Sequence, residues 1–202
     1  MRLYLIRHAV TAETGRKLSS KDPKIPLSAA GQQMAAALAE HLSSVELQAI
    51  YTSPMTRCRQ TIAPLAAARG IPIRSDKAFV EADYGTWLGR PLASVFKLKA
   101  WSNLMATPSR FRFPEGDTLR EVQQRAVAAV ERLAETHQGQ PVAVGSHADI
   151  IRVILAHYLG SPLDLIHRIN ISPASVSIVE LHKSGQVLVP VMNHVADVGS
   201  WR

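Results

Sequence analysis

An apolar run near the start of the chain, Leu3–Ile6, ends abruptly at two basic residues, Arg7 and His8. Continuous apolar runs of this length are typical of strands buried within an α/β sheet. Ligands of open α/β sheets gather beyond the carboxyl ends of the strands, so Arg7 and His8 stand where a ligand would bind. A lone Arg-His pair is also common where a chain simply leaves its core. The interpretation of this strand end as a ligand site therefore needs support from other parts of the sequence.

A second strand-to-helix junction lies further along the chain. Ala49–Tyr51 is a short apolar strand, and the following Ser53 and Pro54 suit the start of a helix. Serine can cap free backbone amides, and proline fits the first turn. Arg57 then falls on that turn, where the free amides and the helix dipole favour an anion. The alternative for Arg57 is an exposed helix face, as for its neighbour Arg59.

A third junction again ends on a histidine. The apolar run Pro141–Ser146 stops at His147 and is followed by a helix predicted from about Asp149 to Leu159. Because strands alternate with helices along the chain, the strands are expected to be parallel. The carboxyl ends of parallel strands meet at one edge of a sheet. His8, Arg57 and His147 are therefore expected to lie together.

The whole pattern predicts an α/β fold, a three-layer α/β/α sandwich with a mostly parallel central sheet. Further predicted features are an N-cap at Ser28, a capping box at Thr118–Glu121, an edge strand at 71–73, and a hairpin of strands 175–181 and 187–192. Residues 1–202 are expected to form one domain with a small cap insertion at about 90–116. The polar segment 10–24 is expected to be a surface loop that could wrap a ligand.

Two segments carry further candidates for chemistry. The loop Glu81–Gly89 contains two carboxylates, two aromatic residues and two glycines. A carboxyl group among aromatic side chains can gain the raised proton affinity that a general acid needs, although both carboxylates could equally belong to a turn. The cap region has aromatic residues that suit packing. Its basic residues, which could face an acidic substrate, are Lys97, Lys99, Arg110 and Arg112.

Composition narrows the possible partners. The formal net charge of +7 suggests an anionic ligand, but aromatic residues are only 5% and no dense Lys/Arg run is interleaved with them, so nucleic acid is not expected. No secretory signal and no bilayer-spanning apolar run is expected, so no membrane partner is predicted.

Cys58, the only cysteine, is interpreted as a small buried residue, and a cytoplasmic location is expected. The oligomeric state is not indicated.

The candidate residues suit phosphoryl transfer better than metal binding. Two histidines, two arginines and a carboxylate make a poor metal site, because guanidinium groups repel cations and no short-spaced ligand motif is present. Arginine forks match phosphate oxygens, and a neutral imidazole can attack phosphorus to give a covalent phosphohistidine. Neither a metal nor a cofactor is therefore expected.

Four motifs occur in a fixed order along the chain: Arg7-His8, Ser53–Thr61, Glu81–Trp87 and Ser146-His147. Two connecting segments, 26–31 and 114–118, accompany them. In this order and combination the motifs resemble the histidine phosphatase superfamily, specifically its phosphoglycerate-mutase-like branch. The resemblance covers nearly the whole chain.

The resemblance implies a role for each matching residue. His8 would be the phosphorylated nucleophile, and Glu81 would protonate the leaving oxygen and then activate water. The rest of the phosphate pocket would be formed by Arg7, Arg57 and His147. Substrate contacts are expected from Thr14, Tyr84 and Ala148. Asp83 and Asp149 are alternative proton donors, since another branch has an aspartate directly after its second histidine.

The chain departs from the family's usual pattern beside both histidines. Ala9 and Val10 stand where glycine and an acidic residue are usual, and Ala148 and Asp149 stand where a glycine pair is usual. Alanine can replace glycine where the backbone angles are ordinary, so the reaction is expected to be kept. Thr14, Leu88 and Asp149 are expected to alter the surroundings of the leaving portion of the substrate.

These observations predict a metal-independent phosphomonoesterase that acts through a phosphohistidine on a small phosphorylated metabolite. Two alternatives stay open. A phosphoglycerate mutase would use the same pocket, although mutases of this branch tend to carry a longer insertion. A non-catalytic phosphate-binding protein that retains the fold is the third possibility, and the altered residues beside the histidines leave room for it.

Overall fold

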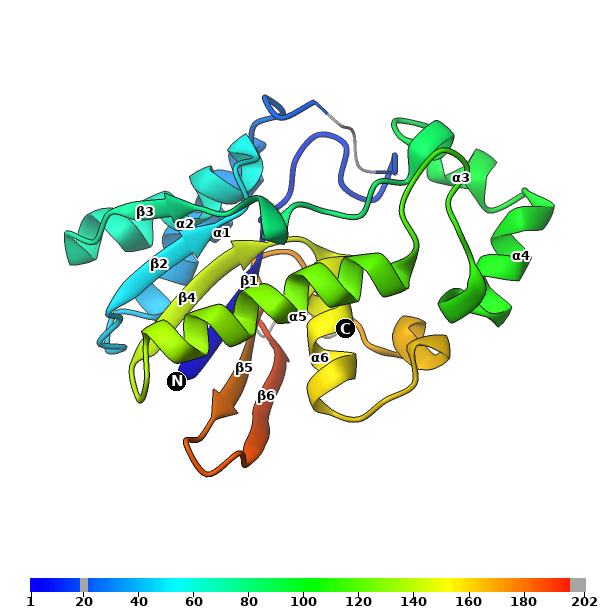
Figure 1. Ribbon diagram of the computed structural model, residues 1–202. Coiled ribbons are helices and arrows are strands. Elements are labelled where there is room, and N and C mark those ends of the chain that lie inside the picture. The colour runs from blue at the N-terminus through cyan, green and yellow to red at the C-terminus, as the bar shows by residue number, and fades with distance from the viewer. Residues whose placement is uncertain (19–21, 197–202) are drawn as a thin grey trace.

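The segments that carry the motifs meet at one edge of a single sheet, where the parallel strands end. In a computed structural model that describes residues 1–18 and 22–196, six strands of those residues form a sheet in the order β3-β2-β4-β1-β5-β6 (Figure 1). Their bounds are β1 (Arg2–Arg7), β2 (Ala49–Thr52), β3 (Ile73–Ser75), β4 (Pro141–Ser146), β5 (Val176–Leu181) and β6 (Val187–His194). Each predicted strand is present, with slightly shifted ends, and β3 lies at an edge as predicted.

The sheet is mixed, because β1 has one parallel and one antiparallel neighbour. β1 is parallel to β4, β4 is parallel to β2, and β2 is parallel to β3. β5 runs antiparallel to β1, and β5 and β6 form the predicted hairpin. The prediction of a mostly parallel sheet is confirmed. The registers place Arg7 opposite Ser146, and Gly145 opposite Thr52.

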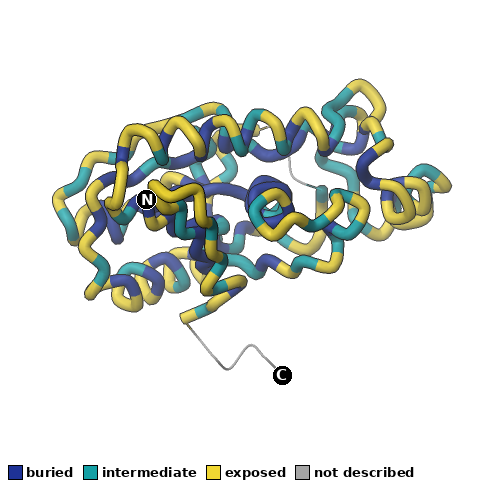
Figure 2. The backbone as a smooth tube through the Cα atoms, turned by 60° about the horizontal axis from the view of Figure 1, so that its bottom comes forward, coloured by how far each residue is buried: buried dark blue, intermediate teal, exposed yellow. Residues whose placement is uncertain are grey.

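Helices cover both faces of the sheet, which confirms the three-layer prediction. The covering helices are α1 (Ala29–His41), α2 (Thr56–Arg69), α5 (Leu119–Thr136) and α6 (Ala148–Tyr158). Leu3 and Leu5 of β1 pack in the core with α5 and α6, whereas Tyr4 and Ile6 pack in the core with α1 and α2 (Figure 1). Figure 2 shows the outcome, with buried residues toward the middle of the molecule and exposed residues along its outside.

Local side-chain bonds mark where two helices begin. Ser28 Oγ accepts a hydrogen bond from the Gly31 amide at 3.1 Å, which caps α1. Thr118 and Glu121 form a reciprocal capping box at the start of α5. Each bond satisfies a backbone amide that has no partner within the helix. Both predicted caps are confirmed.

The start of α2 differs from the prediction. The helix begins at Thr56 with Met55 as its N-cap, so Ser53 does not cap it and Pro54 precedes the first turn. The Ser53 hydroxyl lies instead 2.9 Å from His147 Nε2. The prediction was wrong because a tertiary partner takes the serine oxygen. Arg57 nevertheless falls on the first turn of α2, as predicted.

Short helices occupy the region predicted to be a cap. α3 (Leu92–Val95) and α4 (Lys99–Ala106) lie to one side of the sheet, at the right of Figure 1. Val95 and Leu104 are buried, whereas Phe96 is 50% exposed. Single 3-10 turns are formed by Lys77–Phe79, Gly85–Trp87, Pro108–Arg110 and Leu163–Arg168. The predicted loop 10–24 is irregular in its described part, and Ser19 and Ser20 lie outside the described residues.

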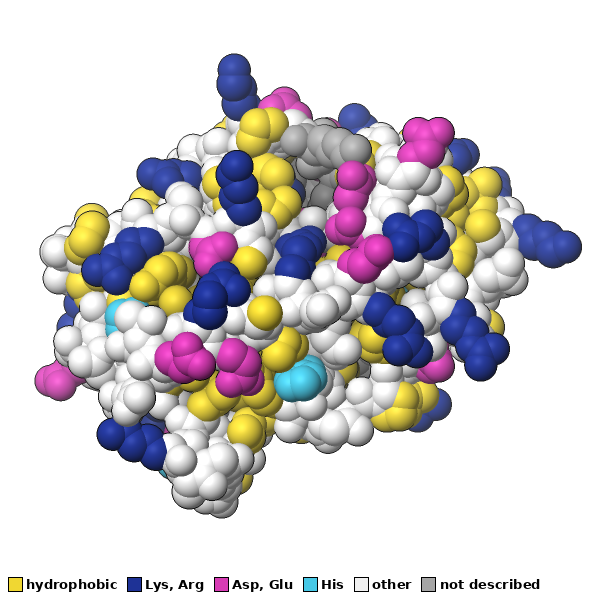
Figure 3. All heavy atoms as spheres, in the orientation of Figure 1, with side chains coloured by type: hydrophobic (Ala, Val, Ile, Leu, Met, Phe, Trp, Pro, Cys, Tyr) yellow, Lys and Arg dark blue, Asp and Glu magenta, His cyan; other side chains and the backbone are white. Residues whose placement is uncertain are grey.

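On the face that Figure 3 shows, basic side chains do not gather into one patch. Lys and Arg side chains are spread over the face shown in Figure 3, with Asp and Glu side chains among them. Within residues 1–18 and 22–196, no helix combines the length and the apolar character that crossing a membrane requires. The expectation that nucleic acid is not a partner stays a prediction.

Gly31 lets α1 pack directly on the segment that follows His8. A β-carbon at Gly31 would lie 2.1 Å from the Val10 carbonyl oxygen. The Ser28 amide donates to the same oxygen at 3.0 Å, so the first turn of α1 is fixed to that segment. A side chain at Gly31 can enter only if backbone moves.

We expect Gly31→Ala to lower the free energy of unfolding by about 1–3 kcal/mol, because either Val10 or the start of α1 must shift. Urea unfolding followed by circular dichroism measures this loss. Gln32→Ala changes the next, exposed position of α1 and should alter the free energy by less than about 0.5 kcal/mol. Equal unfolding midpoints for the two variants would contradict the packing argument.

Candidate active site

A cavity of about 270 Å³ lies at the carboxyl edge of the parallel strands. Arg7 and His8 reach it from the end of β1, Arg57 from α2, Glu81 from the loop after β3, and Asp149 from α6. The residues expected to contact the substrate also line it: Thr14, Tyr84 and Ala148. The predicted meeting of His8, Arg57 and His147 at one edge of the sheet is confirmed, while the roles of all the site residues stay predictions.

His8 is held as a neutral imidazole. Its Nδ1 lies 2.8 Å from the Ala9 carbonyl oxygen, which can only accept, so Nδ1 carries the proton and Nε2 is bare. Burial lowers the pKa of His8 to about 3, with help from the charges of Arg7 and Arg57 and against the effect of the bond to Ala9. A neutral imidazole with an unprotonated nitrogen is the form that can attack phosphorus.

Two guanidinium groups beside His8 present unsatisfied donors. Arg57 Nη1 and Arg7 Nε are buried and have no hydrogen-bond partner among the described residues. Other atoms of both groups are anchored, since Arg7 Nη1 donates to the Ile171 carbonyl at 2.6 Å and Arg57 Nη2 lies 3.5 Å from His147 Nδ1. A buried donor without an acceptor is costly, and a phosphate oxygen would supply the acceptor.

His147 lies next to the reacting groups but does not line the cavity. It is fully buried, and its ring centroid is 5.3 Å from that of His8. Because Arg57 can only donate, His147 Nδ1 is the acceptor, which leaves Nε2 to donate to the Ser53 hydroxyl at 2.9 Å. Burial, followed by His8 and the arginines, keeps the pKa of His147 well below its usual value, so this imidazole is also neutral.

Glu81 has the properties of a general acid. Its carboxyl group is buried and accepts hydrogen bonds from the amides of Ala82 at 3.1 Å and Asp149 at 3.4 Å. Burial, with a smaller contribution from the Asp149 charge, raises the pKa of Glu81 to about 7. A pKa near the working pH suits a group that must give and then regain a proton.

The two alternative donors are less suitable. Asp83 does not line the cavity, and its Oδ1 accepts from the Gly85 amide at 2.8 Å, which stabilises the turn. Asp149 lines the cavity, but its carboxylate accepts from the Tyr84 hydroxyl at 2.6 Å and from Arg152 at 2.8 Å. Burial alone would raise the pKa of Asp149, yet Arg152 and the Tyr84 hydroxyl lower it overall. Asp149 is therefore held as a carboxylate.

The cap region meets the cavity with apolar side chains. Leu92, Trp101, Leu104 and Phe113 line the cavity. The basic residues predicted to face an acidic substrate are exposed and are not among the described residues that line it: Lys97, Lys99, Arg110 and Arg112. Arg112, for example, binds Glu121 at 2.6 Å. That prediction was wrong, because these four side chains face solvent, and on α4 the exposed Lys99 lies opposite the buried Leu104.

Other lining residues were not anticipated from the sequence. Arg152 lies one helical turn beyond Asp149 on α6, and this i,i+3 spacing could have indicated the pair. His167 comes from a 3-10 turn that no motif marks. Thr11, by contrast, belongs to the predicted loop 10–24, and its Oγ1 lies 3.1 Å from Thr14 Oγ1, which holds the loop beside the cavity.

Neither Cys58 nor the polar groups around the cavity suit thiol or metal chemistry. Cys58 is fully buried, and burial raises the pKa of its thiol to about 12, so the thiol is unreactive as interpreted. No group of three or more His, Cys, Asp or Glu residues in the described part of the chain is placed to hold a metal ion. The guanidinium groups of Arg7 and Arg57 face the same space and would repel a cation.

Comparison with known proteins identifies the protein family. The sequence model of the histidine phosphatase superfamily (branch 1) matches residues 3–194. A protein named phosphoserine phosphatase 1 from Hydrogenobacter thermophilus is 28% identical over 196 residues, covering 94% of this chain and 90% of that protein. A probable phosphoglycerate mutase GpmB from Yersinia enterocolitica is 26% identical over 186 residues, covering 91% and 86%.

Solved structures agree with the fold. Bacillus stearothermophilus YhfR superposes with a TM-score of 0.89 at 30% identity, covering 96% of this chain and 97% of that one. A mycobacterial glucosyl-3-phosphoglycerate phosphatase superposes with a TM-score of 0.86, covering 96% and 99%, at 22% identity. The second likeness supports the fold alone.

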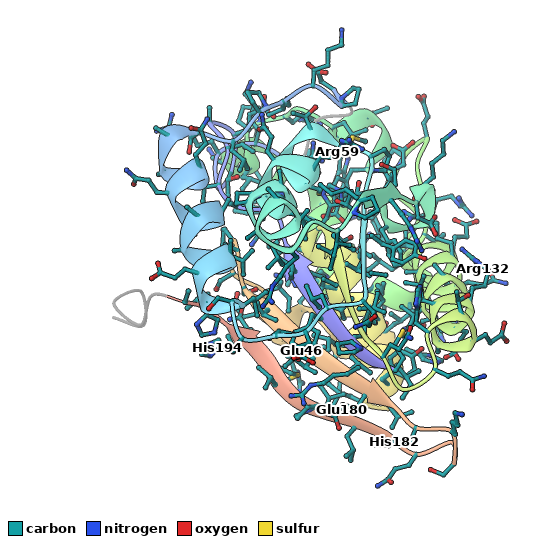
Figure 4. The ribbon with its side chains drawn as sticks, turned by 90° about the vertical axis from the view of Figure 1, so that its left-hand side faces the viewer. Glu46, Arg59, Arg132, Glu180, His182 and His194 are labelled. Atoms are coloured by element: carbon teal, nitrogen blue, oxygen red, sulfur yellow. The ribbon has the colours of Figure 1, made fainter. Side chains whose placement is uncertain are left out.

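We expect Arg57→Met to weaken the binding of inorganic phosphate by about 10- to 100-fold, because a hydrogen bond to a charged group contributes roughly 1.5–3 kcal/mol. Titration calorimetry at fixed ionic strength measures the affinity. Arg59→Met is the matched control, since Arg59 is exposed on α2 and donates to Ser75 Oγ at 2.9 Å (Figure 4). A similar loss in both variants would indicate a general charge effect and contradict the assignment.

Proposed function

Because the chain is a histidine phosphatase that belongs to branch 1 of its superfamily, we propose that it hydrolyses a small phosphorylated metabolite through a phosphohistidine on His8, without a metal. One observation carries the proposal. His8 is a neutral imidazole with a bare Nε2, and it lines the same cavity as the partly unsatisfied guanidinium groups of Arg7 and Arg57. The nucleophile and the phosphate cradle are thus in place together.

In the first step, His8 Nε2 attacks phosphorus as the bond from phosphorus to the ester oxygen breaks. The leaving oxygen takes the proton of Glu81, so an alcohol departs and Glu81 becomes a carboxylate. Arg7 and Arg57 stabilise the charge on the transferring group. His147 acts through its contact with Arg57, which it holds by Nδ1 at 3.5 Å.

In the second step, water replaces the alcohol. The Glu81 carboxylate takes one proton from the water while the water oxygen bonds to phosphorus. The phosphorus–nitrogen bond breaks and its electron pair returns to the His8 imidazole. Inorganic phosphate leaves, and both residues regain their starting forms.

The cavity supports a small substrate. Its volume of about 270 Å³ accommodates a phosphate with a short leaving portion. We propose that residues 90–116 form a cap insertion within a single domain, and the lining by Trp101 and Leu104 supports this. A cytoplasmic location is part of the proposal, since the single cysteine, Cys58, cannot form an internal disulfide.

A phosphoglycerate mutase is the second candidate, favoured by relatives that are named probable phosphoglycerate mutases. Mutase activity would transfer the phosphoryl group of His8 to an acceptor alcohol in place of water. Incubation with a phosphoglycerate, with and without its bisphosphate primer, separates the two reactions. Release of inorganic phosphate without isomerisation supports the phosphatase, whereas primer-dependent isomerisation supports the mutase.

We expect turnover of an aryl phosphate in the presence of a chelator, and its loss by at least about a thousandfold in His8→Ala, which removes the nucleophile. Phosphate release measures the rate. His182→Ala is the matched control, because His182 is exposed and lies beside the β5–β6 hairpin turn, far from α2 (Figure 4).

Two results would overturn the proposed mechanism. One is turnover that the chelator abolishes, and the other is turnover that His8→Ala leaves unchanged. A protein that binds phosphate in the calorimetric assay but hydrolyses no member of a broad panel of phosphorylated metabolites would instead be a non-catalytic phosphate-binding protein.

A further inference from the structure

We propose that Asp149, held by Tyr84 and Arg152, is a positioning residue that keeps the proton on Glu81 until the leaving group takes it. The inference rests on the proposed function, in which Glu81 is the proton donor. It concerns a position where this chain has Ala148 and Asp149 in place of the glycine pair expected from the resemblance to its family.

Glu81 and Asp149 line the same cavity and contact each other. Asp149 occupies the first turn of α6, and its backbone amide lies 3.4 Å from Glu81 Oε2. Both residues line the cavity, and the Asp149 side chain is only 14% exposed. The Asp149 charge acts on Glu81 and raises its pKa, so both groups do not ionise easily together and one of them retains a proton near neutral pH.

Asp149 is the better-stabilised carboxylate. Its Oδ2 accepts from the Tyr84 hydroxyl at 2.6 Å, and its Oδ1 accepts from Arg152 Nη1 at 2.8 Å. Arg152 is itself anchored, because its Nε donates to the Ile169 carbonyl at 2.9 Å. Charge-assisted bonds of this kind and the start of a helix both favour a negative charge.

Glu81 lacks comparable support. Its carboxyl oxygens accept from two backbone amides among the described residues, those of Ala82 and Asp149. Arg125 contacts Glu81 through the backbone carbonyl at 3.2 Å, not through the carboxyl group. The proton of the pair therefore resides on Glu81.

The other ionisable groups around Glu81 act in both directions. The cations that face or contact Glu81 are Arg7, Arg57, Arg125 and Arg152. The acidic groups around it are Asp149, Tyr84 and Cys58. His8 and His147 are neutral, as their lowered pKa values require. A bound phosphate dianion would offset Arg7 and Arg57, so Glu81 would hold its proton more firmly once the substrate has entered.

The test is the pH dependence of kcat/KM in Asp149→Asn, which removes the charge and keeps the shape. With an alkyl phosphate, whose leaving group needs a proton, activity should fall on the alkaline side as Glu81 deprotonates. In Asp149→Asn that fall should begin about one pH unit lower, because Glu81 ionises more easily without its negative neighbour. With an aryl phosphate whose phenol is already a good leaving group, the variant should shift the profile much less.

A direct titration of Glu81 separates this inference from the proposed function. Carbon NMR of labelled carboxyl groups, assigned with Glu81→Gln, should show Glu81 ionising at lower pH in Asp149→Asn than in the wild type. Asp149→Ala gives a second variant, in which the Asp149 charge is also removed and Glu81 should also ionise at lower pH. Glu40→Gln, an exposed position on α1, is the charge-matched control and should leave the titration unchanged.

The outcomes are distinct. An unchanged Glu81 titration in both Asp149→Asn and Asp149→Ala overturns the inference, even if turnover still depends on His8. Turnover that does not depend on His8 defeats the proposed function, and the NMR titration then still decides whether Asp149 controls the proton on Glu81. A shift of the same size in Glu40→Gln overturns the inference, since the effect would be one of overall charge.

Discussion

The parallel pairing of β1 with β4 is the constraint on which the site depends. Its register sets Arg7 opposite Ser146, so His8 and His147 leave the sheet side by side, with ring centroids 5.3 Å apart. Pairing of β2 with β4 then brings Ser53 within reach of His147. A shift of one residue in either register would turn these side chains to the opposite face of the sheet, and the site residues would no longer lie together.

Burial shifts the pKa values of two groups in the site in opposite directions. It lowers the pKa of His8 to about 3 and raises the pKa of Glu81 to about 7, because a low-dielectric site disfavours whichever form is charged. A neutral imidazole and a protonated carboxyl group can thus coexist near neutral pH, as the proposed reaction requires. The guanidinium groups of Arg7 and Arg57 line the same cavity, where an incoming phosphate would meet them.

Most of the fold could be predicted from the sequence because its signals are local. The capping box at Thr118 and the apolar strand that ends at His147 each need only a few neighbouring residues to be recognised. Predictions failed where a distant partner decided the outcome. Ser53 bonds to His147 instead of capping α2, and Lys99 faces solvent because the apolar side of α4, with Leu104, faces inward.

The sequence by itself determined which residues follow the ends of the strands, and hence that His8, Arg57 and His147 could form one phosphate site, to which the family resemblance added Glu81. Only the tertiary structure decided how the protons are distributed within it. The bond from Tyr84 to Asp149 joins residues 65 positions apart, and the amide of Asp149 reaches Glu81 across 68. Burial and long-range contacts of this kind set the pKa values, and no local pattern in the chain records them.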